Sequence, residues 1–255
     1  MAITLTFEHP LNERARTLMR LEHLFEKLSF FQPQDNPWAA RAMVETLLDI
    51  AAVSSRADIK TELIKELDRQ SINLERFRDQ PGVKRKALDT SLSELAAATE
   101  ALRAQEGPVG QRVRENDFLK GVAQRGSLPG GTCSFDLPQY HLWLSLPFRE
   151  RNQQVSRWME DLVATRNAIQ LLLAYIRTSA TSRRVQAREG LYQESLEGTA
   201  PAHLIRIAVQ GDTLLYPEIS GHKNRFAIRF LRTSDQAAPE PVREDLDFSL
   251  ACCVL

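Results

Sequence analysis

The stretch LYPEISGHKNRFAIRF, from Leu215 to Phe230, carries the strongest fold signal in this sequence. Its second half places apolar residues at every other position, and this spacing predicts a half-buried β-strand. These residues are Phe226, Ile228 and Phe230. The pair Ser220-Gly221 favours a turn before the strand, because glycine readily adopts positive φ. The stretch therefore predicts a turn that leads into the strand of a sheet.

The polar face of this strand is expected to be positively charged. It carries Arg225 and Arg229, and the predicted turn adds His222 and Lys223. No Asp or Glu occurs from residue 219 to 232 or from residue 166 to 188, and the second segment also contains several arginines. Two interpretations stay open, a binding surface for an acidic partner and an ordinary solvated strand face.

The same two-residue period recurs through the last third of the chain. Short alternating runs separated by Gly, Pro, Asp and Ser occupy residues 182–193, 203–210, 224–232 and 246–255. One more alternating run, Ile3 to Phe7, opens the chain and ends at Pro10. An isolated strand is not stable, so this first strand is expected to pair into the C-terminal sheet.

Between these strands the apolar period changes to three and four residues, which is typical of amphipathic helices. Helices are predicted over about residues 11–33, 37–50, 58–77, 88–102, 111–125, 140–144 and 150–177. The fold class is therefore α+β. It comprises a helical-bundle domain, residues 10–178, and a small C-terminal antiparallel β-domain, residues 179–255, which the strand at residues 3–7 joins.

The composition favours a globular protein without a strong overall field. The chain has 255 residues, 43% hydrophobic and 26% charged, and Lys plus Arg equals Asp plus Glu at 33 each. We expect a cytosolic protein, because no leader peptide and no run near the ~20 apolar residues of a membrane span occurs. Three cysteines fit a reducing compartment better than a disulfide framework.

The motifs that could carry chemistry are weak. Gly130-Gly131 lacks the Lys-Ser or Lys-Thr of a nucleotide P-loop, so a structural turn is favoured. A further loop contains the residue types of a cysteine nucleophile and its base, without a recognisable signature. These are Cys133, Asp136 and His141. Cys252-Cys253 point to opposite faces of a strand, which argues against a shared metal ion. No enzyme activity, cofactor or metal is predicted.

Five longer strings resemble the ZapD family of cell division proteins, in the same order along the chain. They are FEHPLNER, TELIKELDRQ, PGGTCSFDLPQYHLWL, LYPEISGHKNRFAIRF and LDFSLACC. The resemblance extends from about residue 5 to Cys253. It implies a non-enzymatic, cytosolic homodimer at the mid-cell division ring that binds the C-terminal tail of FtsZ and cross-links FtsZ filaments.

The resemblance also implies a set of basic residues that bind the tail. They are Arg16, Arg20, Arg114, His141, Lys223, Arg225 and Arg229. The chain departs from the family pattern at Asp117, where relatives have another basic residue. A protein that binds nucleic acid through a basic sheet face is the alternative, because arginine-lined strands also contact phosphates. The zero net charge counts against it.

Overall fold

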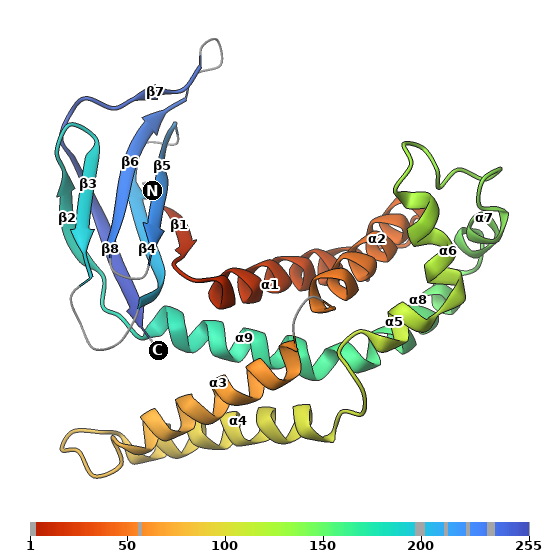
Figure 1. The fold of residues 1–255 in the computed structure, drawn as a ribbon, viewed down its shortest axis with the longest axis horizontal. Coiled ribbons are helices and arrows are strands. Elements are labelled where there is room, and N and C mark those ends of the chain that lie inside the picture. Colours follow the sequence, from red (N-terminus) through yellow and green to blue (C-terminus); the bar gives the residue numbers. More distant parts are fainter. Residues whose placement is uncertain are drawn as a thin grey trace. The chain divides into compact units, whose positions relative to one another are not determined.

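The structure is a computed structural model, and it describes residues 4–55, 58–196, 202–211, 214–222, 225–233 and 238–254. The chain divides into two compact units (Figure 1). The β unit consists of Met1–Met19 and Leu173–Leu255, and the helical unit consists of Arg20–Leu172. Both dividing points lie inside long helices. The division into domains at residues 10–178 and 179–255 stays a prediction.

The β unit contains two antiparallel sheets. Its strands are β1 (Thr4–Pro10), β2 (Arg183–Ala187), β3 (Leu191–Ser195), β4 (Ala202–Gln210), β5 (Leu215–His222), β6 (Arg225–Arg232), β7 (Glu240–Pro241) and β8 (Leu246–Val254). One sheet has the order β1-β4-β8-β2. The other has the order β3-β6-β5, and β7 pairs with β6. The α+β fold class is confirmed.

The core of the β unit is formed by the inward faces of both sheets. Phe230 of β6 and Phe248 of β8 meet edge to face with their ring centroids 5.0 Å apart. The predicted alternation on β6 is confirmed, because Phe226, Ile228 and Phe230 are buried. The N-terminal strand also pairs as predicted, since β1 lies antiparallel to β4. Residue 3 lies outside the described residues.

The turn predicted at Ser220-Gly221 is wrong. Both residues belong to β5 and pair with Ala227 and Phe226 of β6. The glycine serves a close approach instead of a turn, because a Cβ at residue 221 would come within 2.7 Å of the Leu11 side chain. A glycine required by packing looks the same in sequence as a glycine required by a turn.

The helical unit is built from the helices between residues 20 and 172, and the first and last helices of the chain have residues in both units. The helices are α1 (Glu13–Phe31), α2 (Pro37–Ser54), α3 (Ile59–Glu75), α4 (Arg85–Ala104), α5 (Gln111–Glu115), α6 (Asp117–Gly126), α7 (Pro138–Leu144), α8 (Phe148–Met159), the 3-10 turn η1 (Glu160–Leu162) and α9 (Val163–Thr178). Asn36 caps α2, with its Oδ1 accepting from the Ala39 N–H at 2.8 Å. None of the described helices is long and apolar enough to cross a membrane.

Two of the predicted helices are each divided. The helix expected over 111–125 breaks at Asn116, whose Oδ1 accepts from the Leu119 N–H at 3.0 Å and starts α6. The helix expected over 150–177 is interrupted by η1. In addition, the helix expected over 58–77 ends at Glu75, and Phe77 beyond it is 45% exposed. Apolar spacing continues across η1 and could not predict that break. It does not continue across Asn116, because no apolar residue lies between Val113 and Phe118.

Candidate partner-binding surfaces

The polar face of β6 presents two arginines. Arg225 and Arg229 are exposed, while Phe226 and Ile228 between them face the core. Neither side chain makes an ion pair with another residue in the described parts of the chain. Glu218 of β5 lies opposite Arg229 in the sheet register, so one carboxylate does share this face. Arg225 also lines a hollow of about 510 Å³ between the ends of β3, β5 and β6.

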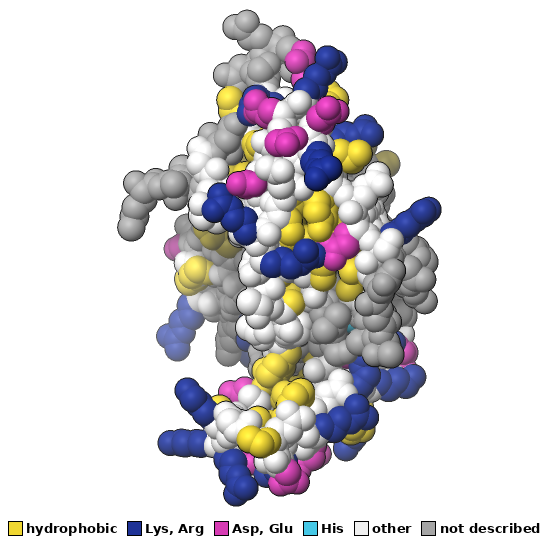
Figure 2. Space-filling view, turned by 90° about the vertical axis from the view of Figure 1, so that its left-hand side faces the viewer, with side chains coloured by type: hydrophobic (Ala, Val, Ile, Leu, Met, Phe, Trp, Pro, Cys, Tyr) yellow, Lys and Arg dark blue, Asp and Glu magenta, His cyan; other side chains and the backbone are white. Residues whose placement is uncertain are grey.

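Other arginines of the β unit are not the free positive surface that the sequence suggested. Arg177 binds Glu8 at 2.8 Å, Arg184 binds Asp247 at 3.1 Å, and Arg183 binds Glu194. On the side of the β unit where β2 and β3 lie, acidic and basic side chains are interspersed (Figure 2). Three arginines of the segment without acids therefore have carboxylate partners from distant strands.

Two of the predicted basic residues lie one turn apart on α1. Arg16 binds Glu13 at 3.2 Å, three residues earlier on the same helix. Arg20 is exposed and makes no ion pair within the described ranges. Because residues four apart share a helix face, the two guanidinium groups project from the same side of α1. The structure thus gives α1 a short basic strip, of which Arg20 is the unpaired part.

Arg114 and His141 differ in how much of each is available to a partner. Arg114 is half-buried, and its Nη1 donates to the Val109 carbonyl at 2.7 Å, so this guanidinium holds the loop before α5. His141 is exposed on α7. Of the seven predicted residues, Arg16, Arg225 and Arg229 belong to the β unit, and Arg20, Arg114 and His141 to the helical unit. Lys223 lies outside the described residues.

The cysteine and glycine motifs have structural explanations. Cys133 Sγ lies 3.2 Å from Asp136 Oδ2, and no hydrogen bond joins Cys133 to His141, both of which are described. A Cβ at Gly131 would lie 2.1 Å from the Arg125 carbonyl, so a close backbone approach requires glycine there. Among the described residues, no group of three or more His, Cys, Asp or Glu is placed to hold a metal ion.

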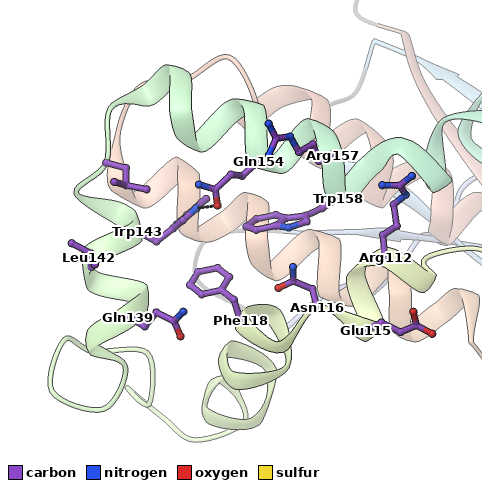
Figure 3. A pocket seen from close by; sticks show the side chains of 11 residues that line it. Arg112, Glu115, Asn116, Phe118, Gln139, Leu142, Trp143, Gln154, Arg157 and Trp158 are labelled. Atoms are coloured by element: carbon purple, nitrogen blue, oxygen red, sulfur yellow. Dashed lines mark hydrogen bonds between the residues drawn. The ribbon is translucent and has the colours of Figure 1, made fainter.

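The helical unit also contains an aromatic pocket that the sequence pattern does not predict. Phe118 of α6, Trp143 of α7 and Trp158 of α8 form its wall, and each pair of ring centroids is 5.7 to 5.8 Å apart (Figure 3). The pocket has a volume of about 730 Å³. Its remaining lining residues are Arg112, Glu115, Asn116, Gln139, Leu142, Leu146, Gln154 and Arg157. Only the convergence of these aromatic residues from three helices reveals the pocket.

A buried carboxylate fixes one side of this pocket. Asp161 of η1 accepts a hydrogen bond from the Arg112 backbone N–H at 2.9 Å, which holds the first turn of α5. Burial raises the pKa of Asp161 above its usual value, and the bond to Arg112 opposes that shift. The Arg112 guanidinium pairs with Glu160 at 2.9 Å. These contacts position the backbone that carries the pocket's rim.

Comparison with known proteins gives the family. A family model described as ZapD, cell division protein, matches residues 19–229. A protein from Methylococcus capsulatus named cell division protein ZapD is 39% identical over 251 residues, 98% of this chain and 98% of its own. Proteins of the same name from Chromobacterium violaceum and Ralstonia pickettii are 38% and 39% identical over 250 and 248 residues. They cover 98% and 97% of this chain, and 99% and 98% of their own. This chain therefore belongs to the ZapD family of cell division proteins.

Proposed function

We propose that this protein is a non-enzymatic adaptor of bacterial cell division that binds the C-terminal tail of FtsZ in the cytoplasm, at the mid-cell ring. In this proposal the protein acts as a homodimer and cross-links FtsZ filaments. Its basic side chains recognise an acidic, apolar and flexible peptide. Membership of a cell division family supports the biological setting.

The observation that carries the proposal is the pair of arginines on β6. Arg225 and Arg229 are exposed on a rigid strand and make no ion pair with other described residues. A cation without an internal partner keeps its full attraction for an external carboxylate, whereas a paired arginine must first break its bond. Arg20 on α1 is likewise exposed and makes no ion pair with another described residue. A peptide that lies across the two β6 arginines gains affinity that falls with added salt.

The test is a double charge reversal, Arg225→Glu with Arg229→Glu, titrated with a fluorescent FtsZ tail peptide. Exposed ion pairs contribute about 0.2 to 1 kcal/mol each, so replacing two attractions with two repulsions should weaken binding roughly tenfold or more. Both side chains point away from the core, so the thermal unfolding midpoint should change little. Raising the salt concentration should weaken wild-type binding in the same direction.

Arg243→Glu is the matched control, because Arg243 is also an exposed arginine of the β unit but lies outside the predicted site. It should bind the peptide normally. A folded double variant that binds the tail like the control would remove β6 from the site. Tight binding of random duplex DNA with no response to the peptide would favour the nucleic-acid alternative instead.

The dimer contact is proposed to lie on the helical unit. Large apolar side chains are exposed there, with Trp38 77% and Phe135 84% accessible. Exposed aromatic residues of this size are typical of protein interfaces. Two copies of one binding surface, related by a two-fold axis, would allow the dimer to join two filaments.

A further inference from the structure

The turn between α3 and α4 concentrates basic residues in a chain whose charges otherwise balance. It leads into Lys84, Arg85 and Lys86, the only three consecutive Lys or Arg residues of the sequence. Arg76 and Arg78 lie on the α3 side of the same turn. No Asp or Glu occurs from residue 80 to 88. We call residues 75–89, all of which the structure describes, the hairpin tip.

Ion pairs between the two helices hold the hairpin tip in place. Arg103 of α4 binds Asp68 of α3 at 3.2 Å, and Arg78 binds Asp89 of α4 at 3.0 Å. Arg78 also binds Glu75 at the end of α3. The two helices therefore pack side by side as an antiparallel hairpin (Figure 1). In this arrangement one arginine already occupies two of the carboxylates near the turn.

The other basic residues of the hairpin tip are available to an external partner. Four of them are exposed and make no ion pair with another described residue: Arg76, Lys84, Arg85 and Lys86. Asp79 is the one acidic residue within residues 75–89 that Arg78 does not bind. Four available cations thus lie close to a single carboxylate. The local field at the tip attracts an anionic partner although the whole chain has no net charge.

Three of these cations stand where a helix favours acidic side chains. Lys84 precedes the first turn of α4 and its side chain makes no capping hydrogen bond, while Arg85 and Lys86 begin the helix. The first turn of α4 contains no acidic residue. The free N–H groups give a helix N-terminus a partial positive charge, so Lys and Arg at this end reduce helix stability. Helix stability therefore does not explain these three residues, whereas binding of an anionic partner does.

Apolar groups are exposed among the cations of the hairpin tip. Phe77 is 45% exposed, and Pro81 is exposed as well. The end of the hairpin, in the lower part of Figure 2, shows charged side chains around an apolar centre. The backbone of a duplex nucleic acid would gain from the cations alone. An anionic membrane surface presents phosphates above an apolar layer that an exposed aromatic ring can enter, so it matches both features.

We propose that the hairpin tip contacts the surface of a membrane that contains anionic lipids. Its four available cations bind lipid phosphates, and Phe77 enters the boundary between headgroups and acyl chains. The contact is peripheral and reversible, because a few cations with one aromatic ring do not amount to a stable anchor. It involves the helical unit alone and goes beyond the proposed binding of FtsZ, on which it does not depend.

The test is cosedimentation of the full chain with vesicles of phosphatidylcholine mixed with phosphatidylglycerol, compared with vesicles of phosphatidylcholine alone. The wild-type protein should bind the anionic vesicles, and added salt should weaken this binding. Arg85→Glu with Lys86→Glu should weaken it about tenfold or more. The thermal unfolding midpoint of this variant should stay the same or rise, because acidic residues suit the start of α4. Phe77→Ser should weaken binding about threefold or more.

Arg149→Glu with Arg157→Glu is the matched control, because both arginines are exposed in the helical unit on α8 and the change in net charge is equal. The control should bind the anionic vesicles like wild type. Equal weakening by the two double reversals would overturn the proposal, since binding would then follow overall charge. Failure of the wild-type protein to prefer anionic vesicles would also overturn it. Binding of duplex DNA that Arg85→Glu with Lys86→Glu abolishes, without vesicle binding, would assign the hairpin tip to nucleic acid instead.

Discussion

Glu8 on β1 and Arg177 near the end of α9 are separated by 169 residues in sequence and joined by a hydrogen bond of 2.8 Å. Arg206 of β4 reaches the same carboxylate at 2.8 Å through its Nε. One acidic side chain therefore ties together the first strand, the last helix and the middle of a sheet in the β unit. All three side chains are largely buried. Their ion pairs therefore stabilise the β unit more than an exposed ion pair does.

Replacing Glu8 with Ala should destabilise the β unit by about 2 kcal/mol, because two half-buried guanidinium groups lose their acceptor. The control is Glu13→Ala, which removes a carboxylate that is 84% exposed in its ion pair with Arg16 and should cost at most about 0.5 kcal/mol. Urea unfolding followed by circular dichroism measures both. Equal stability of the two variants would contradict the role of this cluster.

Local patterns in the sequence predict most helices and strands. Ion pairs between residues far apart in the chain could not be predicted in this way. The alternation of Phe226, Ile228 and Phe230 directly reports one buried strand face, and this face is present. Arg177 appeared uncompensated, because its partner Glu8 lies near the other end of the chain. Pairing across such distances has no local signature. The domain boundaries and the role of the predicted basic residues remain predictions.

The aromatic pocket also depends on contacts between distant residues, which no local sequence pattern reports. Trp143 and Trp158 have the spacing of ordinary core residues within their own helices. Their helices, α7 and α8, follow each other across residues 145–147, and Phe118 reaches the same pocket from α6. A sequence pattern predicts that a side chain is buried, but not whether a hollow remains next to it.

His9 should make the stability of the β unit depend on pH. Burial lowers the pKa of His9 below its ordinary 6.5, and the nearby Arg16 lowers it further. The unfolded chain therefore binds a proton at higher pH than the folded chain, and the free energy of unfolding should fall as pH falls from about 6.5 through the lower folded pKa.

The measurement compares unfolding midpoints at several pH values between 5 and 8 for wild type and His9→Gln. The variant should lose less stability over the acidic part of this range, since it lacks the titrating ring. Arg16→Ala should narrow the pH range over which stability changes, because Arg16 is one cause of the lowered pKa of His9. Parallel pH profiles for wild type and His9→Gln would show that His9 does not contribute.

Cys253 should be the least reactive of the three cysteines. Its side chain is fully buried, and desolvation raises the pKa of the thiol to about 11. At pH 8 only about one thousandth of it is thiolate. Iodoacetamide labelling followed by mass spectrometry should modify the partly exposed Cys133 in the folded protein and Cys253 only after unfolding. Equal native labelling rates for these two residues would contradict the burial.

Binding of a tail and bundling of filaments should be separable in this protein. A surface that binds one tail decorates a filament, whereas a two-fold dimer presents two such surfaces and joins neighbouring filaments. Each filament displays many tails, so weak single contacts add through effective concentration. A monomeric variant should thus keep its affinity for an isolated tail peptide and lose the bundling of FtsZ filaments.

Trp38→Glu combined with Phe135→Glu is the variant for this test, since both side chains are exposed in the helical unit and neither lines the aromatic pocket. Analytical ultracentrifugation reports its oligomeric state, and light scattering with electron microscopy reports bundles. The surface control is Leu128→Glu, a third exposed apolar residue of this unit at 52%, which should leave dimer and bundles intact if the contact is specific. A protein shown to be monomeric that still forms full bundles would require two unlike tail sites on one chain.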